Sequence, residues 1–70
     1  MEMKISINSE EKNIKENINV YDLLVLMELD PKQSGIAVAV DRNVVPKSQW
    51  KSFILEEGSD VEIIRAVQGG

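Results

Sequence analysis

The stretch DVEIIRAV, residues 60–67, decides how the fold is interpreted. Its apolar side chains fall on both parities of a strand, with Val61, Ile63 and Val67 on one and Ile64 and Ala66 on the other. Successive side chains of a strand point to opposite faces of the sheet, so both faces of this strand would be at least partly covered. Since a strand covered on both faces lies inside a sheet, the sequence predicts a central strand over residues 60–67.

The first eight residues, MEMKISIN, give the clearest strand signal in the chain. Apolar residues at positions 1, 3, 5 and 7 alternate with polar ones, which is the pattern of a strand with one buried face. The polar stretch Asn8–Asn13 is expected to turn the chain back. A weaker second strand then completes a hairpin, and its apolar residues of shared parity are Ile14, Ile18 and Val20.

A helix is predicted from about Val20 to Leu29. Asn19 stands where an N-cap belongs, and Asp22 three residues later favours the free amides of the first turn. Four apolar residues fall on one helical face, namely Val20, Leu23, Leu24 and Met27. The helix is expected to end at Asp30-Pro31, because the residue before a proline is disfavoured in the helical region.

A second hairpin is predicted between residues 36 and 45. Ile36–Val40 is a run of β-branched residues and alanine, and Val44-Val45 forms a second run before Pro46. The connecting stretch Asp41-Arg42-Asn43 lacks glycine, which the tight primed turns favour. We therefore expect a loop longer than a two-residue turn.

Residues 47–55 carry Trp50, Phe53 and Ile54 at helical spacing. The segment has room for only a turn or two of helix, which we expect to plug one end of the core. As the only tryptophan, Trp50 would be a candidate for docking a partner, but its spacing and the usual deep burial of tryptophan favour a core position. Glu57-Gly58-Ser59 is expected to turn the chain into the last strand.

The elements follow the order ββαβ, a short helical turn, and β. This order places one main helix across a mixed sheet of four to five strands, an α+β arrangement called the β-grasp or ubiquitin-like fold. Residues 1–67 are expected to form this domain, and residues 68–70 a flexible C-terminal tail ending in Gly-Gly. A domain of 70 residues buries only about 60% of its unfolded surface and has little room for an internal active-site cavity.

Composition excludes several classes of function. The chain has no cysteine and no histidine, so it lacks a thiol nucleophile, an imidazole base and a Cys/His zinc site, and we expect neither an enzyme nor a bound cofactor. Eight basic residues against 12 acidic ones give a net charge of −4, which disfavours nucleic acid. No apolar run approaches the ~20 residues of a membrane span, and we expect a cytoplasmic protein that is monomeric when free.

The carboxylates near the last strand are a candidate metal site. They are Glu56, Glu57, Asp60 and Glu62. Because they are spread over a turn and a strand without a recognisable ligand spacing, we interpret them as a solvated face and expect no metal.

The last three residues, Gln68-Gly69-Gly70, are the candidate functional site. Two glycines in the last two positions would arise by chance with odds of about 0.5%. A terminal carboxylate that must reach a nucleotide inside another protein needs a narrow arm, and glycine has no side chain to obstruct the passage. The Gly70 carboxylate would attack the α-phosphate of ATP, and a sulfur nucleophile would then displace AMP. Taken alone, a frayed terminus explains the glycine pair equally well.

Three longer stretches carry a more specific pattern. They are VYDLLVLMELDP (residues 20–31), IAVAVDRNVVPKSQW (residues 36–50) and LEEGSDVEIIRAVQGG (residues 55–70). In order, they contain AVAV, a short turn, VPxSxW, an EG turn, VEIxxAV and a terminal Gly-Gly. This pattern resembles the ThiS family, the sulfur carrier proteins of thiamine biosynthesis, along essentially the whole chain. Two departures are Asp41-Arg42-Asn43 in place of an Asn-Gly turn and Gln68 in place of a third glycine, and neither touches the terminal pair.

The resemblance implies a cycle in which the protein is a substrate of its partners. A ThiF-like adenylyltransferase would consume ATP to adenylate Gly70, while Gly69 would give the tail access to that enzyme's channel. A cysteine desulfurase or related donor would supply the sulfur that converts Gly70 to a thiocarboxylate. Thiazole synthase would then receive the sulfur.

The residues just before the tail are candidate partner contacts. Arg65 would pair with an acidic surface of the activating enzyme, although a solvated strand residue is the simpler interpretation. Ile64 and Ala66 would form an apolar patch for partners if their face of the sheet is open, or they would lie under a loop. Burial of both side chains would exclude the patch.

Three other functions remain open on the sequence. The first is a sulfur carrier of the same fold that serves molybdopterin synthesis or tRNA thiolation. The second is a ubiquitin-like modifier whose Gly70 is joined to a lysine of a target protein. The third is a passive interaction module in which Gly70 has no role.

Overall fold

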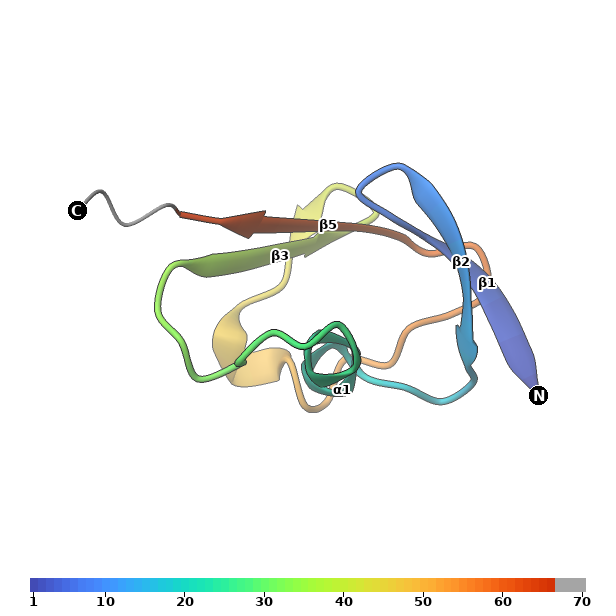
Figure 1. The fold of residues 1–70 in the computed structure, drawn as a ribbon, viewed down its shortest axis with the longest axis horizontal. Coiled ribbons are helices and arrows are strands. Elements are labelled where there is room, and N and C mark those ends of the chain that lie inside the picture. Colours follow the sequence, from blue (N-terminus) through green and yellow to red (C-terminus); the bar gives the residue numbers. More distant parts are fainter. Residues whose placement is uncertain (67–70) are drawn as a thin grey trace.

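Strand β5, Asp60–Arg65, lies at the centre of a five-stranded mixed sheet. The computed structural model describes residues 1–66, in which the strand order is β2-β1-β5-β3-β4 (Figure 1). β5 runs parallel to β1 and antiparallel to β3. The other elements are β1 Glu2–Ile7, β2 Glu10–Lys15, α1 Val20–Leu26, β3 Ile36–Val40, β4 Asn43–Val44 and the 3-10 helix η1 Lys47–Gln49. Figure 1 shows α1 lying across one face of the sheet, which confirms the predicted mixed sheet packed against one main helix.

Only one face of β5 is covered. Val61 and Ile63 face the helix side with 0% and 9% of their surface exposed, whereas Ile64 on the other face is 62% exposed. The predicted central position is confirmed, but the expectation that both faces are covered is wrong, because α1 packs against one face of the sheet. Val67 and the tail residues 68–70 lie outside the described residues, so the domain limit at residue 67 stays a prediction.

The first hairpin turns over two residues. Asn8 and Ser9 have φ angles of 49° and 71°, the left-handed pair that a type I′ turn requires. β2 therefore begins at Glu10, and its polar sequence EEKNIK pairs with β1 along its full length. The predicted turn over residues 8–13 and the continuation of the strand beyond residue 15 are wrong. β2 is an edge strand whose side chains are mostly exposed. Its sequence therefore lacks the alternation of apolar and polar residues by which a strand is predicted.

Helix α1 begins where the sequence predicts. Asn19 caps it, since its Oδ1 accepts a hydrogen bond from the backbone N–H of Asp22 at 2.6 Å. Val20, Leu23 and Leu24 are buried against the sheet. The predicted N-cap and the predicted apolar face of the helix are both confirmed.

The end of α1 comes earlier than predicted. The N–H of Glu28 donates to the carbonyl of Val25 at 3.0 Å, and the N–H of Leu29 donates to the carbonyl of Leu24 at 2.9 Å. Glu28 has a φ of 63°, so these two bonds form a Schellman motif. The helix therefore ends at Leu26, and its expected extension to residue 29 is wrong because a left-handed residue stops it before the proline is reached.

The second hairpin also has a two-residue turn. Asp41 and Arg42 have φ angles of 51° and 70°, and the strand register is Ala39 opposite Val44 and Val40 opposite Asn43. The expectation of a longer loop is wrong. Asp41, a short polar residue, tolerates the left-handed conformation, and its two hydrogen bonds with Asp60 hold the turn. A primed turn therefore forms here without glycine, with Arg42 also left-handed.

Residues 47–55 close one end of the core, as predicted. Trp50 is 2% exposed, and its Nε1 donates to the carbonyl of Val45 at 2.9 Å. Phe53 is partly buried against the core, whereas Ile54 is 50% exposed and does not contribute to the plug. The predicted core position of Trp50 is confirmed.

The core fills the space between α1 and the covered face of the sheet. Its buried apolar residues are Met3, Ile5, Ile7, Ile18, Val20, Leu23, Leu24, Val38, Val40, Val45, Trp50, Leu55, Val61 and Ile63. Among the helices of residues 1–66, the structure shows none that is long and apolar enough to cross a membrane.

Candidate functional site

The predicted sulfur-carrying residue Gly70 and its neighbour Gly69 lie outside the described residues. The described part of the candidate site is the end of β5 at Ile64, Arg65 and Ala66, which leads into the tail. Figure 1 shows this end of β5 at the side of the molecule remote from the N-terminus. These three residues are therefore the part of the candidate site whose geometry the structure describes.

The end of β5 is anchored from both sides. The N–H of Ala66 donates to the carbonyl of Gly35 at 2.7 Å, and Gly35 has a φ of 85°, a conformation that favours glycine. On the other side, Asn8 accepts a hydrogen bond through its Oδ1 from the N–H of Ile63 at 2.9 Å. The chain thus leaves the sheet from a fixed point at Ala66.

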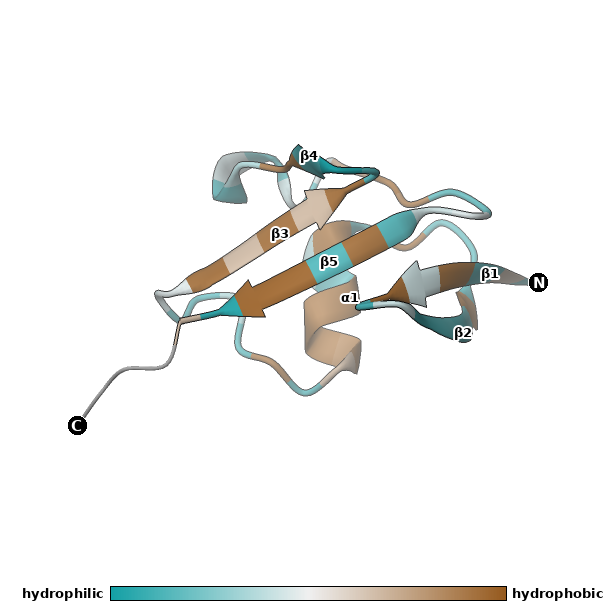
Figure 2. Cartoon of the chain, turned by 90° about the horizontal axis from the view of Figure 1, so that it is seen from above, coloured by the Kyte–Doolittle hydropathy of each residue, from teal (hydrophilic) through white to brown (hydrophobic). Residues whose placement is uncertain are grey.

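An exposed apolar patch lies on the sheet face opposite α1, and we name it the outer-face patch. Ile64 and its strand partner Ala37 are both exposed on this face. Val44, which is 74% exposed, pairs with Ala39 on the same face, and Ala66 shares the parity of Ile64. Figure 2 views the sheet from this side, with α1 behind it, and shows the apolar residues along β3 and β5. Ile64 and Ala66 are exposed, so the predicted patch remains accessible to a partner.

Three members of the outer-face patch are not among the contact residues that the sequence predicts. They are Ala37, Ala39 and Val44, which lie in the predicted second hairpin. The signal was present in IAVAV (residues 36–40), where valines at 38 and 40 alternate with alanines. Since the valines of this strand are buried, the smaller alanines of the opposite parity must face outward.

Arg65 lies on the other parity from Ile64, so the three predicted contact residues do not share one face. Arg65 lines a shallow hollow of about 250 Å³ together with the loop residues Gln33, Ser34 and Gly35. The ion pair recorded within residues 1–66 joins the N-terminal ammonium group to Glu16 at 4.0 Å, and no carboxylate there pairs with Arg65. The guanidinium is therefore an exposed cation at the root of the tail.

The described residues contain no constellation for metal binding. In residues 1–66, no group of three or more His, Cys, Asp or Glu side chains is placed to hold an ion, and this includes the carboxylates Glu56, Glu57, Asp60 and Glu62. What the site offers instead is a fixed exit point for the tail, an apolar surface on one face and a cation on the other.

Comparison with known sequences identifies the family. The ThiS family model matches residues 2–70. The sulfur carrier protein ThiS of Escherichia coli (strain K12) is 29% identical over 68 residues, which cover 97% of this chain and 100% of that protein. A thiazole synthase of Paramagnetospirillum magneticum (strain ATCC 700264 / AMB-1) is 36% identical over 70 residues, but the chain spans only 20% of that protein's length.

Solved structures share the fold. The crystal structure of the thiamine biosynthesis protein ThiS from Geobacter metallireducens superimposes with a TM-score of 0.81 at 20% identity, covering 97% of this chain and 100% of that one. Its NMR solution structure gives a TM-score of 0.80 at 20% identity, with 97% and 88% covered. These likenesses confirm the predicted β-grasp fold. Through the family match over residues 2–70, the chain is a homologue of the sulfur carrier protein ThiS and belongs to the ThiS family.

Proposed function

We propose that this protein carries sulfur for thiamine biosynthesis as a thiocarboxylate on Gly70. The observation that carries the proposal is the family match, which runs through residue 70 and so includes the Gly69-Gly70 pair. The alignment with the Escherichia coli sulfur carrier covers the whole of that relative, which supports the same role for this chain.

The proposed chemistry takes place on the terminal carboxyl group of Gly70. Its oxygen attacks the α-phosphate of ATP, releasing pyrophosphate and leaving an acyl-adenylate. The terminal sulfur of a protein persulfide then attacks the acyl carbon and displaces AMP. Cleavage of the resulting S–S bond by a thiol reductant, which supplies two electrons, leaves the thiocarboxylate on Gly70.

The protein acts in this scheme as a co-substrate rather than as an enzyme. Because the chain has no cysteine and no histidine, we propose that the sulfur nucleophile and the acid-base groups come from the partners, while this chain supplies the Gly70 carboxylate. We propose a ThiF-like adenylyltransferase as the activating partner, which binds and consumes the ATP, and a cysteine desulfurase or related protein as the sulfur donor. We propose that the cycle runs in the cytoplasm, where ATP for the adenylation is available.

Thiazole synthase is the proposed acceptor of the sulfur. This proposal is supported by the 36% identity to a segment of a protein that is named a thiazole synthase. It favours thiamine synthesis over molybdopterin synthesis or tRNA thiolation, which would use the same carrier chemistry.

We assign the body of the protein the role of docking. Ile64 and Ala66 would contact the activating enzyme through the outer-face patch, because an exposed apolar patch gains free energy when a partner covers it. Arg65 would pair with a carboxylate of that enzyme from the opposite face. Gly69, having no side chain, would let the last residues enter a narrow channel.

Intact-mass measurement tests the proposal. The protein is incubated with ATP, the adenylyltransferase, a cysteine desulfurase and cysteine, beside a variant that lacks Gly69-Gly70. The expected result is a mass gain equal to the exchange of one oxygen for one sulfur in the full chain and no gain in the truncated one. Unchanged mass in the full chain, with an adenylyltransferase that is active on its own carrier, would refute the proposal.

A further inference from the structure

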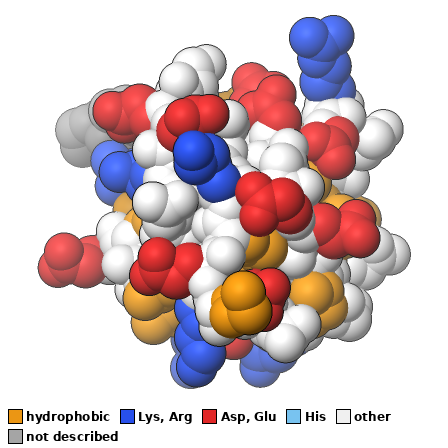
Figure 3. All heavy atoms as spheres, turned by 90° about the vertical axis from the view of Figure 1, so that its right-hand side faces the viewer, with side chains coloured by type: hydrophobic (Ala, Val, Ile, Leu, Met, Phe, Trp, Pro, Cys, Tyr) orange, Lys and Arg blue, Asp and Glu red, His pale blue; other side chains and the backbone are white. Residues whose placement is uncertain are grey.

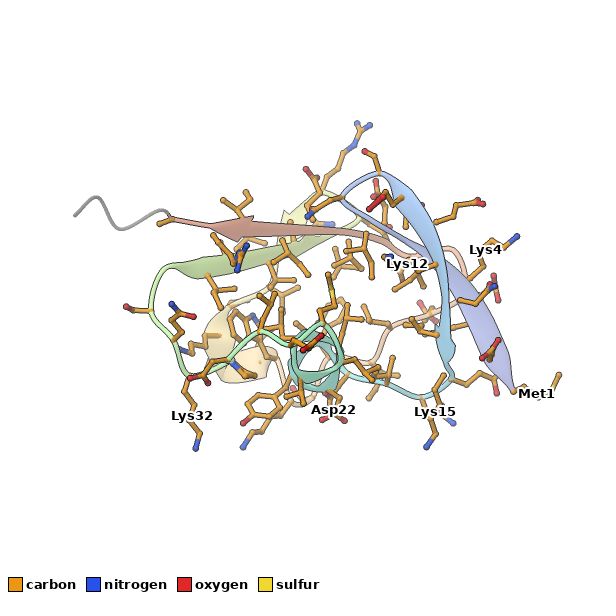
Figure 4. All side chains as sticks on the ribbon, in the orientation of Figure 1. Met1, Lys4, Lys12, Lys15, Asp22 and Lys32 are labelled. Carbon is orange, nitrogen blue, oxygen red and sulfur yellow. The ribbon has the colours of Figure 1, made fainter. Side chains whose placement is uncertain are left out.

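A shallow hollow on the α1 side of the molecule is surrounded by lysines. It has a volume of about 320 Å³, and we name it the lysine hollow; six of its lining residues are Tyr21, Lys32, Lys47, Ser48, Trp50 and Lys51. Three of the eight basic residues of the chain meet here, although the protein as a whole carries a net charge of −4. Figure 4 shows Lys32 on this side, pointing away from the sheet.

Two hydrogen bonds hold the base of the lysine hollow in place. The carbonyl of Trp50 accepts a hydrogen bond from the N–H of Tyr21 at 3.2 Å, and the carbonyl of Lys51 accepts one from the side-chain amide of Asn19 at 3.0 Å. These bonds join the segment after η1 to the first turn of α1. The stems of Lys47 and Lys51 therefore rise from a fixed base, although their ammonium groups are exposed.

Two of the ammonium groups lie over aromatic rings. Lys47 Nζ is 5.7 Å from the centroid of the Trp50 ring, and Lys51 Nζ is 4.8 Å from the centroid of the Tyr21 ring. Both distances fall within the range of cation–π contacts. Such contacts hold the two charges at the rim of the hollow without neutralising them.

The three lysines of the lysine hollow form no ion pair within residues 1–66. No carboxylate there lies within 4.0 Å of the ammonium group of Lys32, Lys47 or Lys51. The nearby Asp30 uses its Oδ1 to accept the backbone N–H of Lys32 at 2.9 Å. By contrast, Figure 3 shows acidic side chains gathered over the β1–β2 end of the molecule. The lysine hollow is thus a local positive site on an acidic protein.

We propose that the lysine hollow is a docking site for a protein partner whose contact surface carries several carboxylates. Charge complementarity selects this occupant, because opposite charges across an interface steer association and exclude wrong partners. A single exposed ion pair contributes little. Three exposed lysines therefore match a surface that presents several carboxylates together better than they match one small anion.

The position of this site gives it a role distinct from the outer-face patch. The lysine hollow is formed by α1, the loop that follows it and the segment around η1, whereas the patch lies on the opposite face of the sheet. A partner bound at the lysine hollow therefore leaves Ile64 and its neighbours uncovered. The inference stands on the lysines themselves and does not depend on sulfur chemistry at Gly70.

The test is a titration of isotope-labelled protein with a short poly-glutamate peptide, followed by NMR. The variant carries Lys32→Gln, Lys47→Gln and Lys51→Gln, and the matched control carries Lys4→Gln, Lys12→Gln and Lys15→Gln, which remove the same charge elsewhere. The expected shifts lie at the amides of residues 47–51 and at the Trp50 indole. The first variant should bind the peptide about tenfold or more weakly than the native protein. The control should bind it with the native affinity, and rising salt should weaken the control and the native protein equally.

Three results would overturn the proposal. Equal weakening in the two triple variants would mean that the peptide responds only to net charge. Inorganic phosphate binding at the same residues as tightly as the peptide would identify a small-anion site. Concentration-dependent shifts at the lysine hollow without any peptide would show that a second copy of this chain occupies it.

Discussion

Asp41 and Asp60 are linked by two hydrogen bonds. The N–H of Asp41 donates to the carbonyl of Asp60 at 2.8 Å, and the N–H of Asp60 donates to Oδ1 of Asp41 at 3.0 Å. Asp41 is the first residue of the β3–β4 turn, and Asp60 is the first residue of β5. The pair therefore fixes a turn without glycine at the point where the central strand begins.

Replacing Asp41 should show how much this pair contributes. In Asp41→Val, a β-branched residue must adopt a φ of 51° and the acceptor for Asp60 is lost, so we expect a loss of about 2–3 kcal/mol in the free energy of unfolding. Asp41→Asn keeps an Oδ1 acceptor and tolerates the left-handed conformation, so it should cost less than about 1 kcal/mol. Urea unfolding of both variants makes the comparison, and equal stability of the two would contradict the role of the pair.

Asn19 joins the start of α1 to the segment after η1, and its two functions can be separated. Its Oδ1 caps the helix at Asp22, and its Nδ2 donates to the carbonyl of Lys51 at 3.0 Å. Asn19→Ala removes both bonds and should destabilise the protein by about 1–2 kcal/mol. Asn19→Asp keeps the cap and removes only the second bond, so its loss should be smaller. Urea unfolding would refute this account if the aspartate variant were as unstable as the alanine variant.

Trp50 is expected to be the most sensitive of the residues in the segment after β4. Trp50→Phe shrinks a side chain that is 2% exposed and leaves the Val45 carbonyl without its indole partner. We expect a loss of about 2–4 kcal/mol, which is a large part of the stability of so small a domain. Ile54→Val is the control, because Ile54 is 50% exposed, and its loss should stay below about 1 kcal/mol. Circular dichroism follows unfolding without relying on tryptophan fluorescence. Similar losses of unfolding free energy in the two variants would contradict the role of Trp50 in closing the core.

Patterns of burial made most of this fold predictable. The alternation in residues 1–7 gave β1, and the capping residue Asn19 with its apolar face gave α1. Both signals arise because one side of each element must be buried and the other need not be. β2 gave no such signal, since an edge strand of sequence EEKNIK has hardly any buried side chain.

Backbone conformation was less predictable, for a physical reason. Asn8, Ser9, Glu28, Asp41 and Arg42 all adopt positive φ angles without being glycine. Asn8 and Asp41 form hydrogen bonds with residues of β5, and Glu28 donates to Val25 in the Schellman motif of α1. Local propensity does not report these contacts. The outer-face patch is a similar case, because its membership depends on which parity of β5 the helix covers, and the apolar pattern of residues 60–67 is compatible with either.

The outer-face patch gives the sharpest functional prediction. Ile64→Glu places a charge at the centre of the patch, on a side chain that is 62% exposed, so the free energy of unfolding should change by less than about 0.5 kcal/mol. If the activating enzyme covers this patch, kcat/KM for thiocarboxylate formation should fall about tenfold or more, mainly through KM, because a charge would be buried at an apolar contact. Val25→Glu is the matched control, since Val25 is 52% exposed on α1 and the same charge is added away from the patch. Rates are measured by intact mass over a range of carrier concentrations. An unchanged KM for Ile64→Glu, or an equal rise in KM for Val25→Glu, would exclude the outer-face patch as the docking surface. Recognition by the activating enzyme would then depend on the C-terminal tail.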